Sequence, residues 1–159
     1  MATKTTTYLK DTNKDFNNVL DSMHNKSNVQ RIVATGAFTI ANDTTLVSLA
    51  LDGAKTTTLP AAKVGRNIRM VWEVEQATAD LVVTCAGSDT FSGNLSTKIE
   101  GDVVGDGDQI AVAATIVAIT FVDDVNIGSY VDLQCASDGK WLVTGHLVLD
   151  AVGSIPTLA

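Results

Sequence analysis

The sequence predicts an all-β fold, a compact β-sandwich or β-barrel, preceded by a polar N-terminal arm. Short runs of β-branched and apolar residues follow one another from residue 32 onward, and such spacing is typical of sandwiches and barrels. Turn-forming pairs such as Asp138-Gly139 separate the runs. The two prolines, Pro60 and Pro156, interrupt none of them, as expected because proline cannot donate a hydrogen bond within a sheet.

Residues 1–31 form the arm, which is rich in Thr, Asn, Lys and Asp and poor in apolar residues. Four apolar residues within it follow the i, i+3, i+4, i+7 spacing of one helical face. We therefore expect a short amphipathic helix, which Asp11, Thr12 or Asn13 can cap. Such a short helix is marginal in water by itself, so it needs a partner surface, either its own β-domain or a neighbouring subunit or shell. The expected docking residues are Phe16, Val19, Leu20 and Met23.

Residues 32–159 are predicted to form the β-domain. Its clearest hairpin joins Ser129–Cys135 to Lys140–Val143 through a turn that ends in Asp-Gly. Trp72 and Trp141 fall in predicted strands, where we expect core positions. The predicted strands are Arg31–Thr35, Ala37–Ile40, Thr45–Leu51, Thr56–Leu59, Asn67–Val74, Ala79–Cys85, Lys98–Gly101, Thr115–Val122, Ser129–Cys135 and Lys140–Val148.

Composition narrows the class of protein. The chain has 159 residues, which is the length of one domain. Charged residues make up 18% of it, against about 25% in an ordinary globular domain, and the mean hydropathy is positive, at +0.19. Either the core is large or apolar surface is covered by other subunits.

Charge and hydropathy patterns bear on partners and location. The net charge is -7 and the basic residues are scattered, which argues against a nucleic-acid partner, because phosphate binding needs clustered Lys and Arg. The N-terminus has no apolar segment typical of a secretory signal. The longest apolar stretch, Ile110–Val122, is too short to span a bilayer. We therefore expect a protein made in the cytoplasm without a signal peptide and without a membrane partner.

Motifs for catalysis are not recognisable in the sequence. His24 lies in the polar arm and His146 near the end of a predicted strand, without the neighbours of a Ser-His-Asp triad. No glycine-rich phosphate loop occurs. Most acidic residues fall in turns, where Asp bonds nearby backbone amides, so we expect no enzyme, no cofactor and no carboxylate pair of the glycosidase kind. The acids considered are Asp80, Asp89, Asp102 and Asp150.

A Gly/Asp segment at residues 101–108 is a weak candidate for calcium. Its carboxylates Asp102, Asp106 and Asp108 can supply the oxygen ligands that Ca²⁺ prefers. The segment does not match the EF-hand pattern, and a tight turn between strands explains the same residues. We expect no metal site here.

Two cysteines, Cys85 and Cys135, lie far apart in sequence, each within a stretch of alternating apolar residues. A free cysteine in such a position behaves as a small buried hydrophobe. A disulfide between them is possible only if their strands adjoin, and a reducing cytoplasm disfavours it.

Three motifs, in this order, resemble a β-module found in decoration, fibre and spike proteins of tailed phages. The resemblance covers roughly residues 56–148, and the chain departs from the module between Gly93 and Thr115, where it carries the long Gly/Asp segment. The motif residues have scaffold roles: Pro60 ends a strand, Gly65 makes a turn, and Gly139 supports a hairpin. The motifs are TLPAAKVGR at residues 58–66, AGSDTFSG at residues 86–93 and ASDGKW at residues 136–141.

The resemblance implies a structural virion protein. Because the chain is short and shows no internal repeat, an outer-capsid decoration (cement) protein is favoured over a fibre. The resemblance further implies that the chain forms a homotrimer, which binds the major capsid protein on the capsid surface of the virion. The alternatives are a head-fibre, baseplate or tail component and, less favoured, a carbohydrate-binding module or small hydrolase.

Overall fold

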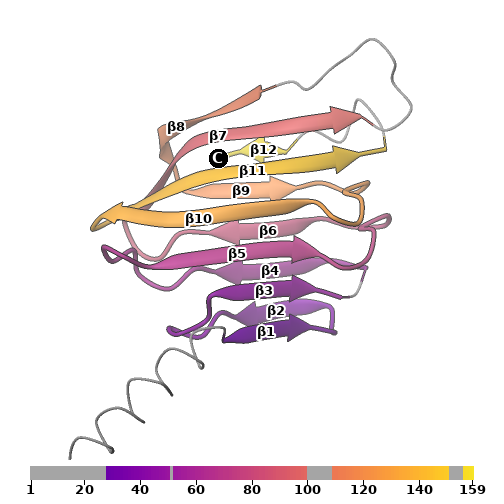
Figure 1. The fold of residues 1–159 in the computed structure, drawn as a ribbon, viewed down its shortest axis with the longest axis horizontal. Helices are drawn as coiled ribbons and strands as arrows, with labels where there is room; N and C mark the ends of the chain where they lie inside the picture. The colour runs from indigo at the N-terminus through magenta and orange to yellow at the C-terminus, as the bar shows by residue number, and fades with distance from the viewer. Residues whose placement is uncertain (1–27, 51, 100–108, 151–155) are drawn as a thin grey trace, which may run out of the picture.

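A computed structural model describes residues 28–50, 52–99, 109–150 and 156–159 (Figure 1). These residues form twelve β-strands in two sheets and no helix, which confirms the all-β class. The first strand, β1, begins at Val29, so the sheet includes the last three residues of the range assigned to the arm. The predicted arm helix, with its docking residues, lies outside the described residues: Phe16, Val19, Leu20 and Met23.

One sheet has seven strands and the other five, and the order below is the order in space. The seven-stranded sheet consists of β1 (Val29–Ile32), β3 (Leu46–Leu49), β5 (Asn67–Trp72), β10 (Tyr130–Ser137), β11 (Lys140–Leu149), β7 (Thr90–Ile99) and β8 (Gln109–Ile116). The five-stranded sheet consists of β12 (Thr157–Leu158), β9 (Ala118–Phe121), β6 (Leu81–Thr84), β4 (Lys55–Thr58) and β2 (Gly36–Thr39).

The first six strands alternate between the two sheets. Strands β1, β3 and β5 pair in parallel in the larger sheet, and β2, β4 and β6 pair in parallel in the smaller one. The chain therefore winds through three turns of a flattened coil, with each turn contributing one strand to each sheet. No sequence repeat marks this winding, and the paired strands of successive turns differ in their pattern of buried and exposed positions.

The second half of the chain completes both sheets. The predicted hairpin is confirmed: β10 and β11 pair antiparallel, with a register shift near their turn. Strand β11 pairs in parallel with β7 over ten residues, and β7 pairs antiparallel with β8. Because β10 also pairs with β5, the hairpin connects the coil to the β7–β8 pair.

The core lies between the sheets, and both tryptophans belong to it as predicted. Trp72 is 2% exposed and Trp141 is fully buried. The Trp72 ring meets Phe121 of the opposite sheet edge-on, with 5.3 Å between ring centroids, and its Nε1 donates to Gln76 Oε1 at 3.1 Å. Burying one such side chain contributes about 1.5–3 kcal/mol, so this contact helps to hold the two sheets together.

Two strand predictions differ from the structure. The stretch Thr115–Val122 is not one strand: β8 ends at Ile116 in the larger sheet, and β9 begins at Ala118 in the smaller. The chain changes sheets at Val117, where two successive amides donate to the Ala159 carbonyl. Strand β7 begins at Thr90, earlier than predicted, because its pairing with β11 extends through residues whose sequence resembles a turn.

Candidate functional site

The three motifs that resemble the phage module come together in space. The Ala62 amide donates to Asp89 Oδ2 at 2.6 Å, and the Val64 amide donates to Asp138 Oδ1 at 3.0 Å. The Gly139 amide donates to the Ala62 carbonyl at 3.2 Å. Each motif therefore bonds another through its backbone, and we call this meeting point the motif junction.

Further backbone bonds strengthen the motif junction. The Thr90 amide donates to the Gly139 carbonyl at 3.0 Å. The Gly65 amide donates to the Cys135 carbonyl at 2.9 Å, and the Cys135 amide donates to the Arg66 carbonyl at 2.9 Å. Because the motif carboxylates accept bonds from backbone amides, their geometry fits the scaffold role that the sequence predicts.

Both cysteines are free and buried. Burial, aided by the nearby negative charge of Asp89, raises the pKa of Cys85 to about 12. Burial likewise raises the pKa of Cys135. A thiol must ionise before it reacts as a nucleophile or binds a metal, so these cysteines act as the small hydrophobes expected from the sequence.

His146 lies on the outer face of the larger sheet, beside Ser96. The distance from Ser96 Oγ to His146 Nδ1 is 3.0 Å, and Ser96 Oγ also donates to the Gly145 carbonyl at 2.9 Å. Which of Ser96 Oγ and His146 Nδ1 donates in their contact depends on the tautomer of the histidine.

Charged pairs occupy the same outer face. Arg31 Nε lies 2.8 Å from Glu73 Oε2. Arg69 binds both carboxylate oxygens of Asp132, at 2.6 and 2.7 Å, and its guanidinium lies 4.9 Å from the centre of the Tyr130 ring. Such exposed pairs contribute about 0.2–1 kcal/mol each.

The outer face of the smaller sheet is different, because its outward residues carry no charge. Strand register places these residues in two rows, one through Thr56 of β4 and one through Thr58. The one lysine of β4, Lys55, points inward, is 1% exposed and donates to the Gly53 carbonyl at 2.9 Å. We call this surface the threonine face. It consists of Ala37, Thr39, Thr56, Thr58, Val82, Thr84, Ala118, Thr120 and Thr157.

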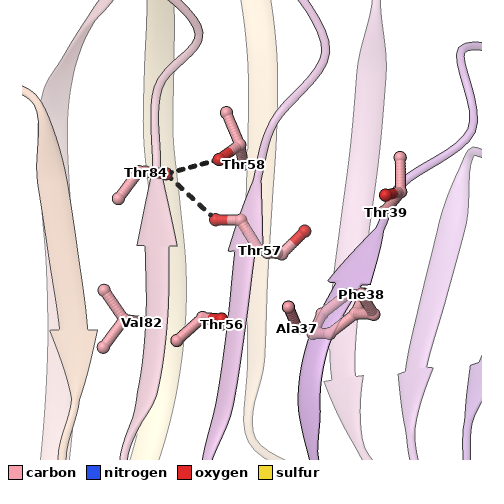
Figure 2. A pocket seen from close by; sticks show the side chains of 8 residues that line it. All are labelled: Ala37, Phe38, Thr39, Thr56, Thr57, Thr58, Val82 and Thr84. Carbon is pink, nitrogen blue, oxygen red and sulfur yellow. Dashed lines mark hydrogen bonds between the residues drawn. The ribbon is translucent and has the colours of Figure 1, made fainter.

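A shallow hollow of about 360 Å³ lies across β2, β4 and β6 on the threonine face (Figure 2). Thr84 of β6 lines one side of the hollow (Figure 2): its Oγ1 is 3.0 Å from that of Thr58 and donates to the Thr57 carbonyl at 3.2 Å. Phe38, half-buried at the sheet edge, also lines the hollow. The surface thus combines methyl groups with hydroxyls that both donate and accept.

This arrangement favours an uncharged partner. A charged ligand would lose its hydration there without gaining a counter-charge, and that loss is costly. The face was not predicted from the sequence. Its signal is the alternation of threonine with buried residues in β4, but strand order is needed to show that other threonines lie beside them.

His24, Asp102, Asp106 and Asp108 fall outside the described residues. Within the described ranges, no group of three or more His, Cys, Asp or Glu side chains can hold a metal ion.

Comparison with protein families, curated protein sequences and solved structures finds no match to this chain. In the part of the chain that the structure describes, no helix has the length and apolar character needed to cross a membrane.

Proposed function

We propose that the chain is a structural protein of a tailed-phage virion: an outer-capsid decoration (cement) protein without enzymatic activity. In this proposal the β-domain is a sandwich that forms a homotrimer, and the N-terminal arm carries a helix that docks on the major capsid protein. The observation that carries the proposal is the threonine face, which bears no charge although the chain has a net charge of -7.

An uncharged sheet face suits assembly because the centre of a protein interface is depleted of charged residues. Burying hydroxyls and methyls avoids the large desolvation penalty that charges would incur. The motif junction supports the same reading, because the motifs shared with the phage module bond one another and shape the domain.

The size of the face indicates that it does not act alone. Four strands of four residues and one of two, about 4.8 Å apart and at about 3.3 Å per residue, give a plane of about 300 Å². A stable interface needs about 800 Å² from each partner. The remaining contacts within the trimer are expected to come from parts of the chain outside this face.

Stabilisation would follow from mass action. A protein that binds only the assembled shell lowers its free energy in proportion to the logarithm of one plus its concentration over its Kd. No chemical step is needed, which agrees with the raised pKa values of both cysteines.

Light scattering after size-exclusion chromatography tests the assembly. We expect the purified chain to have the mass of a trimer and Thr56→Lys, on the threonine face, to dissociate it. The matched control is Thr144→Lys, an exposed threonine of β11 on the opposite outer face, which should leave the mass unchanged. A wild-type monomer that does not associate at any concentration would refute the proposed assembly.

The place in the virion is tested separately. Virions that contain the chain are split into heads and tails, and each fraction is probed with an antibody against the chain. Recovery with heads supports the decoration role. Recovery with tails would instead support the baseplate or tail alternative.

A further inference from the structure

Strands β1 and β2 are the edges of the two sheets at the same end of the molecule (Figure 1). An edge strand presents backbone N–H and C=O groups that can pair with a further strand. Gln30 covers part of the β2 edge, because its Nε2 donates to the Thr39 carbonyl at 2.7 Å and its Oε1 accepts from the Ala41 amide at 3.3 Å. In the described part of the chain, no strand pairs with the outer edge of β1.

The hydrogen bonds of β1 show which groups face this open edge. The Asn28 and Ile32 carbonyls accept from the β3 side, from the Thr45 amide at 3.0 Å and the Ala50 amide at 2.9 Å. Successive residues of a strand direct their N–H and C=O groups to opposite sides. Val29 and Arg31 therefore direct two donors and two acceptors away from the sheet.

Side-chain bonds hold β1 in place. Asn28 Nδ2 donates to Asp43 Oδ2 at 2.7 Å, and Arg31 Nε donates to Glu73 Oε2 at 2.8 Å. Together with the contacts of Gln30, these bonds fix the strand before any partner arrives. The carboxylate of Glu73 also offsets the one charge on β1.

We propose that the open edge of β1 pairs antiparallel with β1 of a second copy of this chain, about a two-fold axis at Gln30. Val29 then lies opposite Arg31 of the partner copy, and each of these two pairs exchanges both backbone bonds, as hydrogen-bonded antiparallel pairs do. The Val29 side chain, 55% exposed, packs on the aliphatic stem of that arginine.

A second copy fits this edge better than a flexible peptide does. A peptide must be ordered on binding, at a cost of about 1–2 kcal/mol per residue, whereas β1 of a second copy is already ordered. Preorganisation of this kind favours binding. A two-fold contact also uses the same patch on both copies, so the four outward groups of one β1 meet their complements on the other.

This contact is independent of the proposed phage function. A two-fold contact cannot be one of the contacts within a ring of three copies, because those contacts are related by a three-fold axis. It therefore joins two monomers or two trimers and doubles the mass of whichever unit the chain forms. Failure of the edge contact removes the doubling and leaves the unit itself unchanged.

The substitution Val29→Pro tests the proposal. The Val29 amide faces the open edge, so proline removes a donor that a partner needs without removing a β1–β3 bond, and proline is tolerated on edge strands. At high protein concentration, light scattering should show the wild type and the control Val29→Thr at about twice the mass of Val29→Pro. Equal masses for wild type and Val29→Pro at all concentrations would overturn the proposal.

Amide hydrogen exchange in the wild type gives a test that does not depend on a variant folding. We expect the Val29 and Arg31 amides to exchange more slowly as protein concentration rises. The Ala37 amide, on the β2 edge beside the Gln30 contacts, is the internal control and should not change. Exchange of Val29 and Arg31 that is the same at low and high concentration contradicts the pairing.

Discussion

Removing the Asp89 carboxylate should destabilise the fold more than removing the other motif carboxylate, that of Asp138. Asp89 Oδ2 accepts from the Ala62 amide at 2.6 Å, and Ala62 is 5% exposed. A hydrogen bond to a charged group contributes about 1.5–3 kcal/mol, and a buried donor left unpaired costs about 1–3 kcal/mol. We therefore expect Asp89→Ala to lower the free energy of unfolding by about 2–3 kcal/mol.

Two further variants separate the lost bond from general disturbance of the motif junction. Asp89→Asn keeps an oxygen acceptor for the Ala62 amide but replaces a charged hydrogen bond by a neutral one. It should therefore lower the free energy of unfolding by about 1 kcal/mol. Asp138→Ala removes the acceptor of the Val64 amide, but Val64 is 66% exposed and water can replace the carboxylate. Its loss should also stay within about 1 kcal/mol.

Urea unfolding measures these differences. With a slope of about 2 kcal/mol per molar urea, Asp89→Ala should shift the unfolding midpoint by about 1 M. Fluorescence of the buried tryptophans and circular dichroism should give coincident transitions, which justifies a two-state treatment. The reasoning fails if Asp138→Ala is as costly as Asp89→Ala, or if Asp89→Ala unfolds at the wild-type midpoint.

Three further predictions concern single residues elsewhere. Gly93 has a φ of +139°, and a Cβ there would overlap the backbone of β11. The control position Gly65 has a φ of +84° but open space around it. In urea unfolding, Gly93→Ala should therefore lower the free energy of unfolding by at least about 2 kcal/mol more than Gly65→Ala does. Burial lowers the pKa of Lys55, so the native state binds its proton less tightly than the unfolded state does. Protonated Lys55 therefore destabilises the wild type. The gain in melting temperature of Lys55→Met over wild type should be largest at pH 7 and shrink toward pH 10. Repulsion by Asp150 raises the pKa of Glu75, so ionised Glu75 weakens the fold above that pKa; Glu75→Gln should raise the melting temperature at pH 7 but not below pH 4, and added salt should reduce the gain.

The sequence was informative where local chemistry decides the structure. The Asp-Gly pair before Lys140 predicts the β10–β11 hairpin, and the alternation around Trp72 and Trp141 predicts that both rings are buried. Strand order could not be predicted in the same way. Alternation indicates which side chains point inward, but not which strand lies beside which, so the parallel coil of β1 to β6 was not predicted.

The same limit explains why the motif junction and the threonine face emerge only in the fold. The contact of Ala62 with Asp89 spans 27 residues of sequence, and its partners read separately as a loop and a turn. Thr58 and Thr84 read as ends of unrelated strands until parallel pairing places them side by side. Residues 90–97 of strand β7 were not predicted as a strand, and the close approach of Gly93 to the β11 backbone becomes visible only once the two strands are paired.

The two halves of the fold have different roles, and this division explains where the interaction surfaces lie. The β10–β11 hairpin pairs with β5 on one side and with β7 on the other, and the motif junction ties its turn to the loop after β4. The backbone groups that form these bonds are therefore paired within the domain. The parallel coil of β1 to β6 supplies most of the threonine face and, at β1, an unmatched edge. The first two turns of the coil, from β1 to β4, pair only with strands of the coil, whereas β5 and β6 of the third turn also pair with β10 and β9. The outer surfaces of the first two turns can therefore change without disturbing the hairpin, and we expect substitutions there to alter assembly more than stability.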